Sequence, residues 1–119
     1  MGNRLDAGEA PAATHFSVFR LAGEGEPLRT QFNTDAGKVR LLLLLDPSCP
    51  VCLRGASIVK REVLDQIPSP NLQTYVVWLP VLTELRADEL EAAAQQAARF
   101  ISDPRVWHFS DPEASLGHL

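Results

Sequence analysis

Residues 41–52 read LLLLLDPSCPVC, and this stretch decides the fold that the sequence predicts. Val39–Leu45 is continuously apolar apart from Arg40 and does not alternate with polar residues. Such a run is typical of a parallel strand that is covered on both faces, as in the centre of a sheet. The Asp46-Pro47 pair ends the run after strand length, which favours a strand over a buried helix.

A helix is predicted directly after this strand. Ser48 is a favoured N-cap residue, and Pro50 is tolerated in the first turn of a helix. We therefore expect Cys49 at the first helical position. Apolar residues then recur close to helical spacing as far as Ile67, where a Pro-Ser-Pro sequence ends the helix.

Strands and helices alternate along the rest of the chain. A strand is expected over 16–21, a short helix or an irregular segment over 28–34, a strand over 72–79, a strand over 106–109 and a final helix opening at 111–114. Between the last two strands, Asp88 is the expected N-cap of a further helix, with Glu91 as its capping-box partner. This alternation predicts an α/β protein with an open parallel sheet and right-handed crossovers.

Length and composition fit one folded domain. The chain has 119 residues, of which 45% are hydrophobic, enough for a core. We interpret residues 1–14 as a flexible arm and residues 15–119 as the domain. The net charge of −4 disfavours a nucleic-acid partner, which would require a basic surface.

Membrane and cofactor functions have no support in the sequence. No apolar run approaches the ~18 residues that span a bilayer. The polar start of the chain lacks the apolar centre of a secretory signal, so a cytoplasmic location is expected. A Gly-rich phosphate loop is absent, so nucleotide binding is not predicted, and we expect no cofactor.

The candidate catalytic residues are Cys49 and Cys52, which are the only cysteines of the chain. The start of a helix favours a thiolate, because unpaired N–H groups and the helix dipole stabilise negative charge there. Cys52 follows one turn later, within reach of Cys49. We expect Cys49 to be the exposed nucleophile and Cys52 the buried resolving thiol, with Pro50 and Val51 as candidate substrate contacts.

Other interpretations of the cysteine pair remain open at this point. A Cys-x-x-Cys sequence also occurs as half of a zinc site, which needs two more ligands. His15, His108 and His118 lack the spacing of a zinc-binding pair, and we expect no metal. The two cysteines also fit the role of small core residues. A peroxidase would need an activating Thr and Arg arrangement that we do not find.

The apolar strand followed by Ser48-Cys49-Pro50-Val51-Cys52 resembles the thioredoxin superfamily. The later segment 107–112, WHFSDP, after an additional helix, looks like the bacterial thioredoxin-like and peroxiredoxin-related branch. The resemblance covers about residues 38–119. It implies a thioredoxin-like fold and thiol–disulfide oxidoreductase activity on a protein or small-thiol disulfide, with Cys49 and Cys52 as the redox pair.

The chain departs from that family in two places near the cysteines. Thioredoxins have Trp before the first Cys and Gly-Pro between the two, whereas this chain has Ser48 and Pro50-Val51. They also carry a buried acid six positions before the first Cys, where this chain has Leu43. Asp46 is the nearest acid, and we expect it to cap the turn rather than to relay a proton.

The third departure concerns the end of the family's sheet. No segment matches the family's hairpin with its active-site cis-proline, since Pro80 and Pro112 occur in the wrong order. That hairpin would lie beside Val39–Leu45, and an uncovered leucine strand is a sheet edge that proteins normally avoid. We expect a second copy in a homodimer, the 16–21 strand or residues outside this sequence to cover it. The alternative function is a non-enzymatic thioredoxin-fold binding module or a metal-binding protein.

Overall fold

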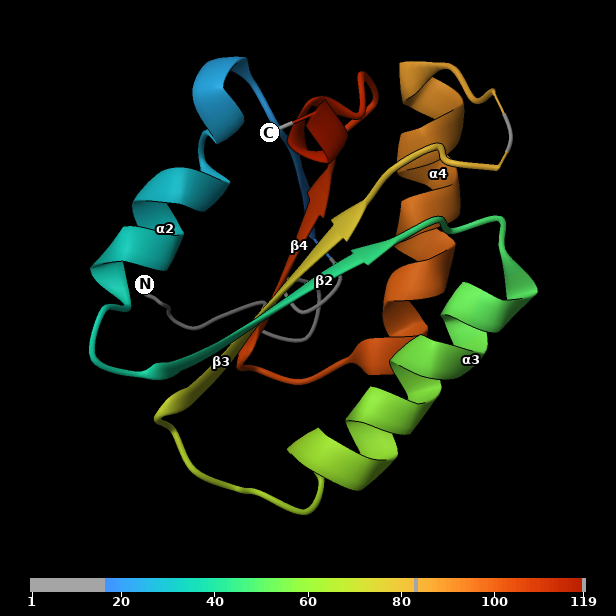
Figure 1. Ribbon diagram of the computed structural model, residues 1–119. Coiled ribbons are helices and arrows are strands. Elements are labelled where there is room, and N and C mark those ends of the chain that lie inside the picture. Colours follow the sequence, from blue (N-terminus) through green and yellow to red (C-terminus); the bar gives the residue numbers. More distant parts are fainter. Residues whose placement is uncertain (1–16, 83, 119) are drawn as a thin grey trace.

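The computed structural model describes residues 17–82 and 84–118 and contains a sheet of four parallel strands (Figure 1). The strands are β1 (Val18–Arg20), β2 (Val39–Leu45), β3 (Leu72–Trp78) and β4 (Val106–Ser110). Their order across the sheet is β1-β4-β3-β2, and every pair is parallel. The predicted α/β class is thus confirmed, while the predicted arm, residues 1–14, lies outside the described part.

Helices cover both faces of this sheet. α2 (Leu28–Thr34) lies on one face, and α3 (Pro50–Val59) and α4 (Ala87–Ala97) lie on the other (Figure 1). α3 continues into the π-helical η2 (Lys60–Leu64), and α4 into the 3₁₀ helix η3 (Ala98–Ile101). Two short 3₁₀ helices complete the described chain, η1 (Gly23–Gly25) and η4 (Ser115–His118).

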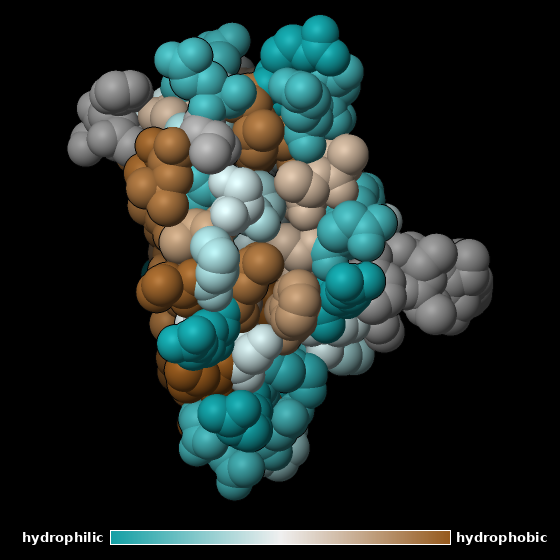
Figure 2. Space-filling view, turned by 90° about the vertical axis from the view of Figure 1, so that its right-hand side faces the viewer, coloured by the Kyte–Doolittle hydropathy of each residue, from teal (hydrophilic) through white to brown (hydrophobic). Residues whose placement is uncertain are grey.

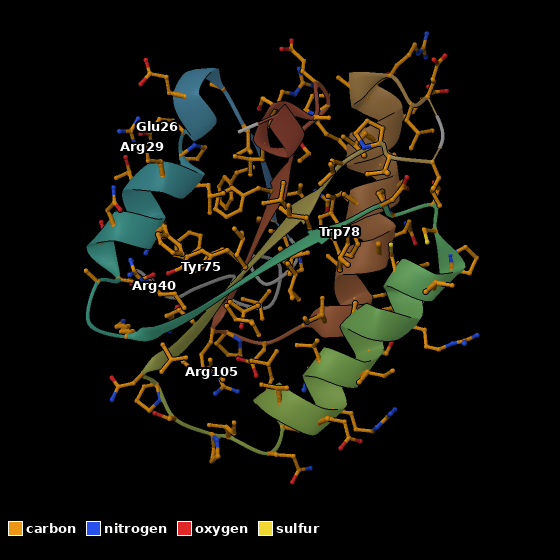
Figure 3. The ribbon with its side chains drawn as sticks, viewed as in Figure 1. Glu26, Arg29, Arg40, Tyr75, Trp78 and Arg105 are labelled. Atoms are coloured by element: carbon orange, nitrogen blue, oxygen red, sulfur yellow. The ribbon has the colours of Figure 1, made fainter. Side chains whose placement is uncertain are left out.

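The central strand β3 separates two apolar cores. Its side chains alternate, so that Val76 and Trp78 pack under α3 and α4 whereas Tyr75 and Val77 pack on the α2 side. Figure 3 shows Tyr75 and Trp78 pointing to these opposite faces. Because helices cover β3 on both sides, its residues from Thr74 to Trp78 are completely buried.

α2 is fixed to the sheet by polar as well as apolar contacts. The Tyr75 hydroxyl donates to the carboxylate of Asp35, just after the helix. Arg40, on β2, places its guanidinium 4.1 Å from the centre of the Phe32 ring and donates to the Phe32 carbonyl at 2.8 Å. A cation over an aromatic ring is attracted to its face, so Arg40 holds α2 beside β2.

The position of β2 corrects one sequence-based expectation. β2 has the predicted bounds and parallel direction, but it is an edge strand, with Leu42 45% and Leu44 47% exposed. The N-terminal strand, β1, pairs with β4 at the opposite edge and does not cover β2. The physical reason is that β4 lies between β3 and β1, so the two edge strands are separated by two others.

The start of α4 also differs from the prediction. Its N-cap is Arg86, two residues before Asp88, and the carboxylate that accepts from the Arg86 N–H is that of Glu89, at 2.9 Å. Glu91 pairs instead with Arg20 of β1. The local sequence offered three carboxylates for one cap, and the contact with β1 engages Glu91 elsewhere.

Several apolar side chains remain on the surface. Val51, Val81 and Leu82 are 71%, 66% and 66% exposed. In Figure 2 the apolar surface of one side of the molecule gathers along a margin, and polar surface covers much of the remainder. Among the described residues, no helix combines the length and apolar character needed to cross a membrane.

Candidate functional site

The turn after β2 is built around the carboxylate of Asp46, which is only 1% exposed. One oxygen, Oδ1, accepts from the backbone N–H of Ser48 at 2.8 Å and from its hydroxyl at 2.6 Å. The other, Oδ2, accepts from the N–H groups of Val81 and Leu82 at 2.9 and 2.8 Å. Asp46 therefore closes its own turn and joins it to the loop after β3.

These four hydrogen bonds decide the ionisation of Asp46. Burial by itself would raise the pKa of the carboxyl group, because it disfavours the charged form. The donors from Leu82, Ser48 and Val81 together outweigh burial and hold the pKa of Asp46 below its ordinary value. The group is a carboxylate with its lone pairs occupied, which agrees with the expected capping role and disfavours a proton relay.

Cys49 is the N-cap of α3, a role that the sequence assigned to Ser48. Its backbone is extended, with φ −98° and ψ 113°, and its Sγ accepts from the Cys52 N–H at 3.3 Å. Pro50 is the first helical residue. The prediction was displaced by one position because the Ser48 hydroxyl binds Asp46, which leaves the sulfur to cap the helix.

The two thiols have pKa values shifted in opposite directions. Hydrogen bonds from the Cys52 backbone N–H and then from the Cys52 thiol lower the pKa of Cys49 below that of an ordinary thiol. Burial is the main cause that raises the pKa of Cys52, and its hydrogen bond to Cys49 adds to the rise. The Asp46 carboxylate opposes the formation of either thiolate. The pair is thus arranged as one acidic and one less acidic thiol.

The exposures of the two cysteines are the reverse of the expectation. Cys49 is 8% exposed, whereas Cys52 is half-buried. Cys49 is covered because the hydrogen bonds of Asp46 hold its turn against the loop after β3. The predicted roles of nucleophile and resolving thiol therefore depend on the direction of the pKa shifts and not on exposure.

Exposed apolar residues lie on both sides of this turn. Pro50 and Val51, the predicted substrate contacts, are exposed at the start of α3. Val81 and Leu82 join them through their hydrogen bonds to Asp46, and sequence reasoning missed both. Their position shortly after the second apolar strand could have indicated them. Neighbouring parallel strands end at the same edge of a sheet, and ligands of such sheets commonly bind there.

The position of the family's buried acid is apolar in this protein. Leu43 is half-buried and packs against the core beneath α3 and α4. In the same core, the indole N–H of Trp78 donates to Nδ1 of His108 at 3.1 Å. Burial lowers the pKa of His108 to about 4, so this imidazole is neutral near pH 7. Trp78 and His108 therefore have structural roles in this core.

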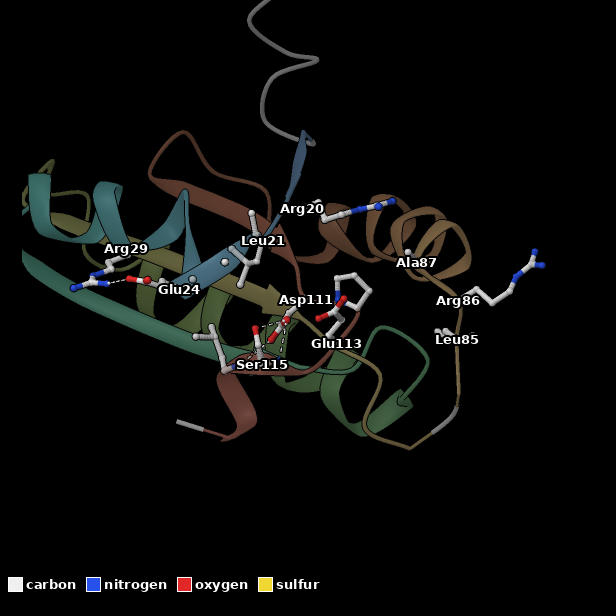
Figure 4. A pocket seen from close by; sticks show the side chains of 15 residues that line it. Arg20, Leu21, Glu24, Arg29, Leu85, Arg86, Ala87, Asp111, Glu113 and Ser115 are labelled. Atoms are coloured by element: carbon white, nitrogen blue, oxygen red, sulfur yellow. Dashed lines mark hydrogen bonds and ion pairs between the residues drawn. The ribbon is translucent and has the colours of Figure 1, made fainter.

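The described residues hold no group of three or more His, Cys, Asp or Glu side chains suited to a metal ion. A cavity of about 860 Å³ lies where β1 and β4 end, and neither cysteine lines it (Figure 4). Its three arginines, Arg20, Arg29 and Arg86, each pair with a carboxylate. The cavity thus presents no uncompensated cation for an anionic ligand.

Comparisons of this chain with protein-family models, curated proteins and solved structures found no match. What the site can do chemically therefore rests on its own geometry. Two thiols one helical turn apart, with Sγ of Cys49 accepting from the Cys52 N–H at the helix start, suit the formation and exchange of a disulfide.

Proposed function

We propose that this protein is a thioredoxin-like thiol–disulfide oxidoreductase, with Cys49 as nucleophile and Cys52 as resolving thiol. The observation that carries the proposal is the hydrogen-bonded pair at the start of α3, in which the pKa of Cys49 is lowered and that of Cys52 is raised. The parallel sheet with a helix beginning beside the cysteines is compatible with the thioredoxin-like fold that the sequence resembles.

The proposed reaction has two exchange steps. The Cys49 thiolate attacks one sulfur of a substrate disulfide, the substrate S–S bond breaks, and the leaving thiolate takes up a proton. Cys52 then loses its proton and attacks Sγ of Cys49, which breaks the mixed disulfide and releases the second substrate thiol. The protein ends with a Cys49–Cys52 disulfide, and two electrons and two protons have passed to the substrate. The reverse sequence oxidises a dithiol.

The surroundings of Cys49 favour a protein disulfide over a small thiol as substrate. Val51, Val81 and Leu82 form an exposed apolar surface beside the cysteine turn, which a polypeptide can cover. A charged small thiol would leave this surface in water. With Leu43 in place of a buried acid, the proton of Cys52 passes to the leaving thiolate or to water, which the half-buried position of Cys52 permits.

Insulin reduction tests this proposal. The oxidised protein is expected to accept two electrons per molecule, and Cys49→Ser is expected to abolish turnover. Cys52→Ser is expected to accumulate a mixed disulfide, because the resolving thiol is missing. Arg54→Ala, on the exposed surface of α3, is the matched control and is expected to keep the wild-type rate. A Cys49→Ser variant with an unaltered rate would refute the proposal.

A non-enzymatic binding module is the second candidate, favoured by the 8% exposure of Cys49. In that case a thiol reagent in native buffer would label Cys49 no faster than it labels a buried thiol. Insulin would not be reduced by any variant. A thiol titration beside the insulin assay thus separates the two functions.

A further inference from the structure

The two edges of the sheet are protected to different degrees. β1 has only three residues, and its last residue, Arg20, pairs with Glu91 of α4. Short edge strands with charged residues resist pairing with another chain. β2, at the other edge, has seven residues, all of them apolar except Arg40.

The backbone of β2 has hydrogen-bonding groups directed away from the sheet. The Val39 N–H donates to the Asn71 carbonyl at 2.8 Å, and the Leu45 carbonyl accepts from Leu79 at 2.9 Å. Since backbone groups alternate in direction along a strand, the odd-numbered residues of β2 bond to β3. The N–H and C=O groups of Arg40, Leu42 and Leu44 therefore point outward, and no strand of the described chain lies beyond them.

The side chains of β2 do not protect this edge. Val39, Leu42 and Leu44 are 67%, 45% and 47% exposed. The register with β3 runs unbroken from Val39 to Leu45, so no bulge interrupts the strand. A long, flat and apolar edge of this kind is a template for a further strand.

We propose that β2 pairs with β2 of a second copy of this chain, antiparallel, in a two-fold symmetric dimer. A two-fold axis at the edge requires antiparallel strands, and only the outward-facing residues can exchange hydrogen bonds across it. The register that uses all of them places Leu42 opposite Leu42 and Arg40 opposite Leu44 of the second copy. Each opposed pair then exchanges two hydrogen bonds.

Charge is compatible with this register. The two Arg40 residues lie four positions apart along the paired strands, about 14 Å, which exceeds the screening length of about 8 Å at physiological salt. Each Arg40 guanidinium is also held over Phe32 on its own copy. Lys38, just before β2, pairs with Asp35 of its own copy at 3.5 Å, so its charge is compensated within the copy.

The dimer leaves the two cysteine sites apart. Each site follows the carboxyl end of its own β2, and the two ends are separated by the length of the strand pair, about 20 Å. Association therefore does not depend on the proposed redox activity, and Cys49→Ser is expected to dimerise like the wild type.

Sedimentation velocity over a concentration series, in reducing buffer, tests the dimer. Leu44→Lys is expected to weaken association about tenfold or more, because it places a cation directly opposite Arg40 of the second copy. Ile67→Lys is the matched control, since Ile67 has the same 47% exposure but lies after η2. It is expected to dimerise like the wild type. Equal weakening by both variants, or by neither, would overturn the proposal.

Hydrogen exchange of the unaltered protein gives a second test that needs no variant. In a dimer, the amides of Arg40, Leu42 and Leu44 gain protection as the protein concentration rises, while those of Leu41 and Leu43 are protected throughout. A monomer at millimolar concentration, with the three outward amides exchanging freely, would overturn the proposal and leave the edge to another occupant.

Discussion

Two turns of this protein begin in the same way and end differently. Each follows a strand and starts with Asp-Pro, and each Asp, Asp46 or Asp111, is almost completely buried. Three residues later the chain folds back, since the N–H of Cys49 donates to the Asp46 carbonyl at 3.1 Å and that of Ala114 donates to the Asp111 carbonyl at 2.9 Å. The same local sequence therefore produces the same first step of the turn.

The difference lies in what the second carboxylate oxygen binds. Oδ2 of Asp46 accepts from Val81 and Leu82, in a loop 35 and 36 residues away. Oδ2 of Asp111 accepts from Leu116, five residues on in its own segment. The carboxylate of the first turn thus connects the ends of β2 and β3, whereas the carboxylate of the second turn bonds only within its own segment. The same local motif can therefore have a tertiary role in one place and a purely local role in another.

The largest expected effect is a loss of stability that differs between substitutions of Asp46 and Asp111. Asp46→Ala leaves partly buried amides of two loops without their acceptor, and we expect it to lower the free energy of unfolding by about 3–4 kcal/mol. Asp111→Ala removes a local cap, and we expect a loss of about 1–2 kcal/mol. Urea unfolding followed by circular dichroism measures both.

Equal losses in these two variants would contradict the proposed difference between the turns. Glu113→Ala, an exposed residue of the second turn, serves as the control and is expected to leave stability unchanged within about 0.5 kcal/mol.

The pH dependence of stability is the next effect in size. The folded-state pKa of Asp46 is lowered, so its contribution is present above the unfolded pKa near 4 and is lost as the pH falls through the folded value. Asp46→Asn is expected to be less stable by about 2 kcal/mol at pH 7, a gap that narrows below about pH 4. Urea midpoints between pH 7 and pH 3 measure it, and a gap independent of pH would contradict it.

The third residue after each Asp is Cys49 in the first turn and Ala114 in the second, and the pKa of a thiol at these two positions is the next comparison. Cys49 has an extended backbone and begins an α-helix, whereas Ala114 has φ +51° and precedes only a short 3₁₀ helix. Two single-thiol variants are compared: Cys52→Ala, which keeps Cys49, and Ala114→Cys in the Cys49→Ser/Cys52→Ser background. The pH dependence of their iodoacetamide reaction rates is expected to give a lower pKa for Cys49 than for the introduced thiol. The reason is that Cys52→Ala keeps the backbone N–H that stabilises the Cys49 thiolate.

The same iodoacetamide measurements give the contribution of the Cys52 thiol to the lowered pKa of Cys49. Cys52→Ala is expected to raise the pKa of Cys49 relative to the wild type, because it removes the thiol hydrogen bond. A pKa for Cys49 equal to or above that of the introduced thiol would refute acidification by the helix start.

The smallest expected effect concerns the serines of the two turns. The hydroxyls of Ser48 and Ser115 donate to Oδ1 of Asp46 and Asp111 at 2.6 and 2.9 Å. Both are partly in water, so we expect Ser48→Ala and Ser115→Ala each to cost about 0.5–1 kcal/mol. Thermal unfolding of the two variants in parallel measures this, and a loss in one that greatly exceeds the other would mean that the turns differ locally as well.

Local patterns predicted much of the fold. The bounds of β2 follow from an apolar run and its breakers and agree with the prediction. Residues 28–34, expected as a short helix or an irregular segment, form the helix α2. Helix caps were predicted less well, because several polar residues compete for each cap and tertiary contacts choose among them. The apolar run of β2 also misled, since uniform leucine indicates burial but does not distinguish a central strand from an edge strand.

For the candidate site, the sequence by itself determined the cysteine pair, the proline after Cys49 and a helix start within one residue of its position in the structure. These depend on residues within one turn of each other, where the chain has few choices. Only the tertiary structure decided that Val81 and Leu82 lie beside the cysteines, that Cys49 is the more buried thiol, and that β2 is an edge. Each of these depends on the order of strands in the sheet, which arises from packing across long separations in the chain.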